Sequence, residues 1–168
     1  MKVFEKINIL KIIKNHLKTL VNDNDKKPDF SDWLVFLLIP LFSAGVLTYF
    51  DVKLSDKLTN LVITTLSILV GLLFNVVVIL FDIIKRDNSK NLKNRLLEEI
   101  LTNISYSIFI SLIIIFFTVL SFFDNYIWLK IMLFITYFLL THFSLTILMI
   151  LKRVYTLFIN EIDEIAKK

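Results

Sequence analysis

Six polar or small residues recur at helical spacing inside a stretch that is apolar enough to cross a membrane. The stretch from Leu58 to Ile84 reads LTNLVITTLSILVGLLFNVVVILFDII, and its polar and small members are Asn60, Thr64, Ser67, Gly71, Asn75 and Asp82. Steps of four, three, four, four and seven residues place them on one helical face. Hydrocarbon offers these groups no hydrogen-bond partner, so we expect this face, the first stripe, to meet another helix, another subunit or water.

Two interpretations of the first stripe remain open. Small and hydroxyl residues let helices approach closely, and Ser67 and Gly71 form a small-xxx-small pair, so packing between helices or subunits is favoured. Alternatively, the face lines a pore in which Thr64 and Asn75 form neutral rings and Asp82 forms an anionic ring at the cytosolic mouth. A ring of subunits would use the same face for both purposes.

A second stripe follows the same spacing in a later apolar stretch, and consists of Asn103, Ser107, Ser111 and Thr118. Further along the chain, His142 is the ionisable residue deepest within any predicted span, which invites a role in proton relay or pH sensing. The favoured alternative is a neutral imidazole bonded to a Ser, a Thr or a backbone carbonyl on a neighbouring helix. His16, on an amphipathic segment, is predicted to be a solvated surface residue.

The residue types argue against an enzyme. The chain has no cysteine and only two glycines, which excludes thiolate chemistry and glycine-rich phosphate loops. Two carboxylate clusters lie outside the apolar stretches, and neither has a histidine at metal-ligand spacing. They consist of Glu98 and Glu99, and of Glu161, Asp163 and Glu164. We therefore expect no catalytic residue, no metal, no cofactor and no direct binding of nucleic acid.

Composition identifies the elements that carry these residues. Hydrophobic residues make up 57% of the chain and the mean hydropathy is +0.75, which is typical of membrane proteins. Charged residues lie in blocks between apolar runs, which predict an all-α polytopic domain over 32–151 with four spans at about 32–50, 58–84, 101–123 and 127–151. Pro40 should kink the first span or free a carbonyl.

Basic residues predict the orientation. Lys and Arg number seven before the first span, five in the middle loop and four in the tail, against two and one in the other loops. The positive-inside rule then places both termini in the cytoplasm. We expect cytosolic helical extensions on that side: an amphipathic helix and linker over 1–31, which either lies among lipid headgroups or packs on the bundle, and a C-terminal helix over 152–168.

The overall pattern resembles the small four-span inner-membrane proteins of bacterial anti-phage defence, in particular the Kiwa-type membrane subunit. The resemblance lies in the size, the topology, the LSILVGLLFN core of the second span and the helix RLLEEILTNISYSIF that leads into the third. It implies a homo-oligomer in the bacterial inner (plasma) membrane that senses membrane disturbance and relays it to a cytosolic effector.

Two functions therefore remain as hypotheses. The first is an oligomeric sensor or scaffold subunit with a cytosolic partner, motivated by amphipathic material on one side of the bilayer. The second is a homo-oligomeric pore lined by the second span. A small transporter is a distant third, because no internal sequence repeat is visible.

Overall fold

The computed structural model describes residues 9–20, 30–86, 91–121 and 126–166, and these fold into five helices. The helices are α1 (Ile9–Thr19), α2 (Phe30–Tyr49), α3 (Asp56–Arg86), α4 (Asn91–Leu120) and α5 (Tyr126–Ala166). No strand occurs among the described residues, which confirms the all-α prediction.

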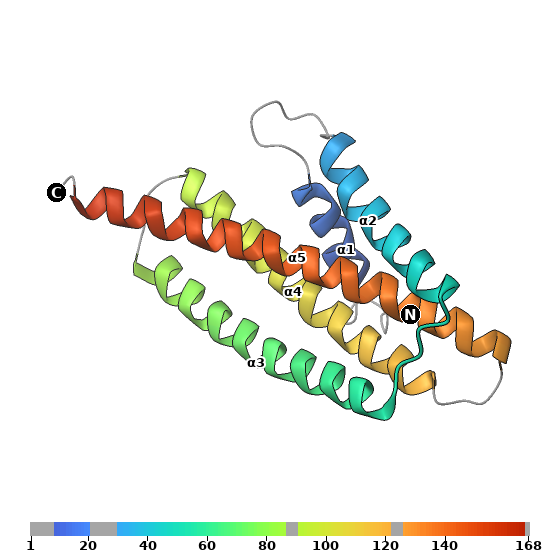
Figure 1. Ribbon diagram of the computed structural model, residues 1–168. Coiled ribbons are helices and arrows are strands. Elements are labelled where there is room, and N and C mark those ends of the chain that lie inside the picture. The colour runs from blue at the N-terminus through green and yellow to red at the C-terminus, as the bar shows by residue number, and fades with distance from the viewer. Residues whose placement is uncertain (1–8, 21–29, 87–90, 122–125, 167–168) are drawn as a thin grey trace, which may run out of the picture.

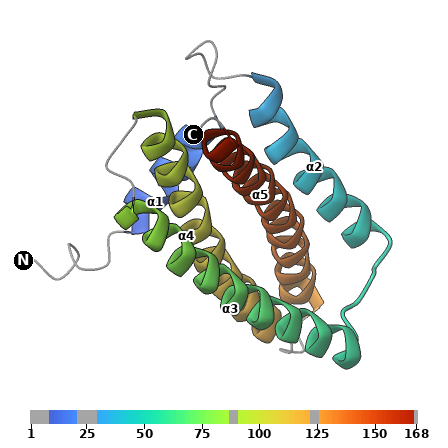
Figure 2. The same cartoon turned by 90° about the vertical axis from the view of Figure 1, so that its left-hand side faces the viewer.

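The helices α3, α4 and α5 run alternately back and forth along roughly one common direction, and α2 is inclined to them (Figure 1). α5 lies at the centre, with α2 packed on one side and α4 on the other, and α3 packs against α4. The short helix α1 lies against α4 on the side away from α2, as the second view makes clear (Figure 2). Successive helices alternate in direction because short connections between adjacent helices favour antiparallel neighbours.

Three helices are long and apolar enough to cross a membrane. Their candidate spans are Asp56–Asp82, Arg95–Leu120 and Ile127–Asn160. The apolar part of α2, Leu34–Tyr49, is shorter than the roughly 20 residues that a perpendicular span requires. Four helices occupy the four predicted positions, and three of them meet the requirement for a span by length and composition.

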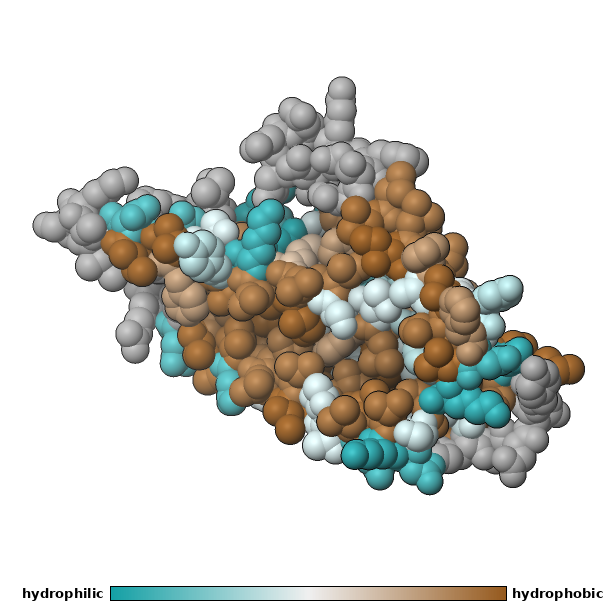
Figure 3. Space-filling model, in the orientation of Figure 1, coloured by the Kyte–Doolittle hydropathy of each residue, from teal (hydrophilic) through white to brown (hydrophobic). Residues whose placement is uncertain are grey.

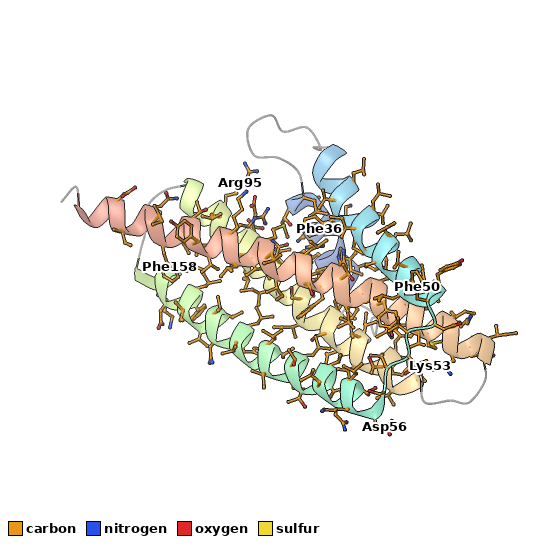
Figure 4. The ribbon with its side chains drawn as sticks, viewed as in Figure 1. Phe36, Phe50, Lys53, Asp56, Arg95 and Phe158 are labelled. Atoms are coloured by element: carbon orange, nitrogen blue, oxygen red, sulfur yellow. The ribbon has the colours of Figure 1, made fainter. Side chains whose placement is uncertain are left out.

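The apolar surface is distributed as expected for helices that cross a membrane. On the face shown in Figure 3, hydrophobic colours cover the middle of the molecule, and hydrophilic patches gather toward its two ends. Lys53 and Asp56 lie at one end, and Arg95 and Phe158 lie toward the other (Figure 4). At the first of these ends, Lys130 forms a 2.8 Å ion pair with Asp51.

α3 attaches to the bundle by one narrow edge. Its buried residues repeat every seven positions, as in left-handed helix packing: Thr59, Leu66, Leu73 and Leu80. Leu73 and Leu80 pack in one cluster with Ile100 and Ile104 of α4 and with Leu157 of α5. Only 11% of the most apolar window of α3 is buried within the chain, against 44% for α4. Most of the other described side chains of α3 are exposed on the outside of the protomer, and those beside the buried edge are partly buried.

The helical extensions continue the long helices without interruption. α4 begins at Asn91, well before the predicted third span, and α5 runs for 41 residues to Ala166. At helical rise α5 is about 60 Å long, twice the roughly 30 Å of a hydrocarbon core. The predicted C-terminal helix is therefore the end of α5. The linker predicted within 1–31 lies mostly outside the described residues.

Candidate functional site

The first stripe lies on the outside of the protomer. Asn60, Thr64, Ser67, Gly71, Asn75 and Asp82 are all exposed. They lie on the face of α3 opposite the buried leucines, because the heptad of leucines and the stripe are about half a helical turn apart. The first stripe therefore meets none of the other helices in the described part of the chain.

The hydrogen-bonding groups of the first stripe are mostly unsatisfied within the described part of the chain. Ser67 donates to the backbone carbonyl of Ile63 at 2.8 Å, whereas the side chains of Asn60, Thr64 and Asn75 have no partner there. A Cβ added at Gly71 would meet nothing within 4 Å. The glycine is thus not required for close packing inside the protomer.

The second stripe is buried inside the protomer, although its residues follow the same spacing in the sequence as the first stripe. Asn103, Ser107, Ser111 and Thr118 are completely buried, each with 0% exposure. Ser111 and Thr118 donate to carbonyls of their own helix, at Ile108 and Ile114, with lengths of 2.7 Å. Small, self-satisfied hydroxyls allow α4 to approach its neighbours closely in the interior of the bundle.

Asn103 holds α1 against the bundle. Its side-chain oxygen accepts hydrogen bonds from Nδ1 of His16 and from the hydroxyl of Thr19, each 2.8 Å long. The His16 ring stacks on Tyr106 with 3.7 Å between ring centroids. The prediction that His16 is a solvated surface residue is wrong, because this side chain is fully buried. An amphipathic pattern cannot tell a docked polar residue from one that faces water.

His142 continues this polar chain to two further helices. Its Nε2 accepts from the Tyr106 hydroxyl at 2.9 Å, and its Nδ1–H donates to the carbonyl of Phe36 at 3.2 Å. That carbonyl lies four residues before Pro40, which has no N–H to bond it. The carbonyl freed at Pro40 and the hydrogen bond of His142 to a backbone carbonyl of another helix agree with the expected geometry, whereas the charge state and the role of His142 stay predictions.

Burial determines the charge state of His16. Desolvation lowers its pKa from 6.5 to about 4, with smaller lowering contributions from His142 and Arg153 and a raising contribution from the hydrogen bond to Asn103. His16 is therefore neutral at neutral pH. Its Nε2 is buried without a hydrogen-bond partner in the described structure, which is a cost that the ring stacking and packing must offset.

Charged groups gather where the end of α1 meets the N-terminal part of α4 and the C-terminal third of α5. Arg153 of α5 donates to the backbone carbonyl of Thr19 and lies 3.5 Å from the carboxylate of Glu99. Glu99 also bonds Arg95 at 3.1 Å. This cluster lies one turn from Asn103, at the end of the bundle that Arg95 marks in Figure 4. We refer to it as the charged end.

The candidate site consists of a buried polar chain and an exposed polar stripe. Within the described ranges, no group of three or more His, Cys, Asp or Glu side chains is placed to hold a metal ion. The buried polar chain of His16, Tyr106 and His142 joins four helices, and the first stripe is exposed on the outside of α3.

The molecule is thus an all-helical protein with three helices able to span a membrane, a docked amphipathic helix and one outward polar stripe. Comparison with known proteins finds no matching family model, no matching curated protein and no matching solved structure.

Proposed function

We propose that this protein is an oligomeric membrane sensor or scaffold subunit that relays a membrane event to a cytosolic partner. The observation that carries the proposal is the contrast between the two stripes: one is buried in the protomer and the other is left outside. In hydrocarbon, unpaired amides such as that of Asn75 favour contact with another polar surface. The corresponding stripe of a second copy supplies such a surface by symmetry.

Disulfide cross-linking tests the assembly directly, because the chain contains no cysteine that would interfere. We expect Asn75→Cys to form cross-linked dimers or higher species in native membranes under mild oxidation. Leu72→Cys is the matched control, since Leu72 is 54% exposed on the same turn of α3 but lies about 60° around the helix from Asn75 and about 100° from Gly71. Equal cross-linking at both positions, or monomer alone at Asn75, would contradict the proposed interface.

A cytosolic partner is proposed from the far end of α5. Tyr155, Phe158 and Ile162 are exposed by 66%, 45% and 59%, and their spacing of three and four residues places them on one face. Leu157, on the opposite face, anchors this part of α5 to α3 and α4. This face lies beyond the span predicted over 127–151, although Tyr155 and Phe158 still belong to the longer apolar stretch Ile127–Asn160. If the bilayer ends near residue 151, an exposed apolar helical face there suits a partner that receives a helix in a groove. The bacterial anti-phage role implied by the resemblance belongs to the same proposal.

Capture of a partner tests the relay. We expect Tyr155→Ser with Ile162→Ser to abolish co-purification of a cytosolic protein from the native host and to abolish the protective or signalling phenotype. Thr156→Ala is the matched control, because its exposed hydroxyl bonds only the Lys152 carbonyl of its own helix. If the double variant keeps both the phenotype and the set of co-purifying proteins, the relay through this face is disproved.

A pore lined by the first stripe is the second candidate, favoured by the same outward position of Asn60, Thr64 and Asn75. Its distinguishing test is conductance in planar bilayers. A pore predicts currents that Gly71→Leu blocks, whereas an assembly surface predicts no current in either protein and fewer cross-links in the variant.

A further inference from the structure

The docking of α1 creates a groove between α1 and α4. The groove has a volume of about 200 Å³ and is lined by Lys11, Ile12, Asn15, Leu101, Thr102 and Ser105. It opens to the outside of the protomer, and it is distinct from the buried chain of His16, Tyr106 and His142 on the inner side of α1.

The polar lining offers three hydrogen-bond donors that are not used within the described structure. Within the described structure, the Lys11 ammonium, the Asn15 amide and the Thr102 hydroxyl have no hydrogen-bond or ion-pair partner. Ser105 donates to the Leu101 carbonyl at 2.9 Å. The lining contains no carboxylate, and the nearest acidic residue on the same face of α4 is Glu98, one turn from Thr102. A cation with adjacent neutral donors is complementary to a phosphate group.

The groove lies close to the charged end. Leu101 is six residues from Arg95, or about 9 Å along the axis of α4, whereas Leu120 is about 28 Å away. If α4 crosses the bilayer, this depth corresponds to the boundary between headgroups and hydrocarbon. Lysines at that level extend their ammonium groups toward the phosphate layer.

Apolar surface continues from the groove toward the opposite end of α4. Leu112 and Phe116 are exposed by 59% and 60%, and helical spacing places them on the same face as Leu101 and Ser105. Donors at one end of a face and exposed apolar side chains along the rest match the two parts of a phospholipid. A free phosphate ion would leave the apolar part unused.

We propose that the groove between α1 and α4 binds the phosphodiester headgroup of an anionic phospholipid, with an acyl chain along Leu112 and Phe116. Bound lipid would hold α1 on the bundle by bridging Lys11 and Asn15 of α1 to Thr102 of α4. The inference rests on the proposed function in one respect, namely that the bundle lies in a membrane, and it names the membrane component that the sensor would read.

Native mass spectrometry of the purified full chain tests the site. The protein is released from detergent micelles that contain phosphatidylglycerol or phosphatidylcholine, and retained lipid is counted. We expect several-fold more phosphatidylglycerol than phosphatidylcholine on the wild type, and about fivefold less phosphatidylglycerol on Lys11→Gln, because one charge-assisted hydrogen bond is lost. Asn15→Leu with Thr102→Val should reduce retention by a similar factor.

Lys18→Gln is the matched control, because it removes the same charge from an exposed position of α1 outside the groove. We expect it to change retention less than twofold. Equal losses in Lys11→Gln and Lys18→Gln would overturn the site in favour of diffuse electrostatic attraction. Equal retention of the two lipids would overturn the proposed preference for an anionic headgroup. If glycerol phosphate were retained in place of lipid, a phospholipid would be overturned as the source of the bound phosphate group.

The fold of each variant is checked by circular dichroism, and Lys11 is exposed, so its replacement should leave the helices intact. The assay uses neither a partner nor a phenotype. A negative lipid result beside preserved cross-linking at Asn75 would therefore overturn the lipid site while leaving the proposed assembly in place.

Discussion

His142 donates a hydrogen bond to the carbonyl of Phe36, the carbonyl that Pro40 deprives of its partner within α2. A proline that weakens one helix is thus matched by a histidine on another. The same ring accepts from Tyr106, so α2, α4 and α5 meet at one imidazole. Further contacts between α2 and α5 include a 2.8 Å hydrogen bond between Ser43 and Thr141.

A double-mutant cycle at Pro40 and His142 tests this relationship. We expect His142→Leu to lower the free energy of unfolding by about 2 kcal/mol, because it leaves the Phe36 carbonyl and the Tyr106 hydroxyl unpaired. In the Pro40→Ala background the new N–H bonds the Phe36 carbonyl, so the same substitution should cost about 1 kcal/mol. Unfolding by SDS titration in mixed micelles measures both costs, and strictly additive costs would contradict the coupling.

Acid should release α1 from the bundle. The folded-state pKa of His16 is lowered from 6.5 to about 4 by burial, so the undocked helix binds the proton more readily. Docking is therefore fully stable above pH 6.5 and loses stability as the pH falls from 6.5 to about 4, by roughly 3 kcal/mol in total. The groups that face His16 are Asn103 and Tyr106 on α4 and His142 and Arg153 on α5.

Thermal unfolding followed by circular dichroism between pH 7.5 and pH 4.5 measures this loss. His16→Phe is the comparison, since its ring preserves stacking on Tyr106 but cannot titrate. We expect the melting temperature of the wild type, relative to that of His16→Phe, to decrease as the pH falls. A constant difference across this range would show that His16 does not control the docking of α1.

The same substitution in the two stripes should have opposite consequences. Asn103→Leu removes the acceptor of His16 and Thr19 at a fully buried position, and we expect it to cost about 2 kcal/mol of unfolding free energy. Asn75→Leu replaces an exposed amide and should change the stability of the protomer by less than about 0.5 kcal/mol. Asn75→Leu should, however, weaken the proposed contact between two subunits about threefold. SDS titration reports the first quantity and blue-native electrophoresis the second.

Gly71→Ala should separate the stability of the protomer from that of the assembly. A Cβ meets nothing within 4 Å at Gly71 or at Gly45, so alanine at either position should stabilise its helix, by up to about 1 kcal/mol. We expect Gly71→Ala alone to reduce the oligomer seen in blue-native electrophoresis, because the added methyl group lies on the first stripe. Identical oligomer fractions in both variants would argue against helix contact at Gly71.

The sequence by itself determined the helical class, the approximate position of every long helix and the two stripes. Twenty-residue apolar runs and four-residue polar spacing are local properties, and they survive in any helical fold of this chain. The freed carbonyl at Pro40 was predictable for the same reason, because the missing N–H is covalent chemistry.

Only the tertiary structure decided which stripe is buried. Asn75 and Asn103 occupy equivalent patterns, but α4 lies between α3 and α5 while α3 has a neighbour on one side only. The burial of His16 was equally invisible, because an amphipathic helix can dock its polar edge when another helix supplies an amide and an aromatic ring. For His16 these partners are Asn103 and Tyr106, which lie 87 and 90 residues away along the chain, and helical periodicity carries no information at that range.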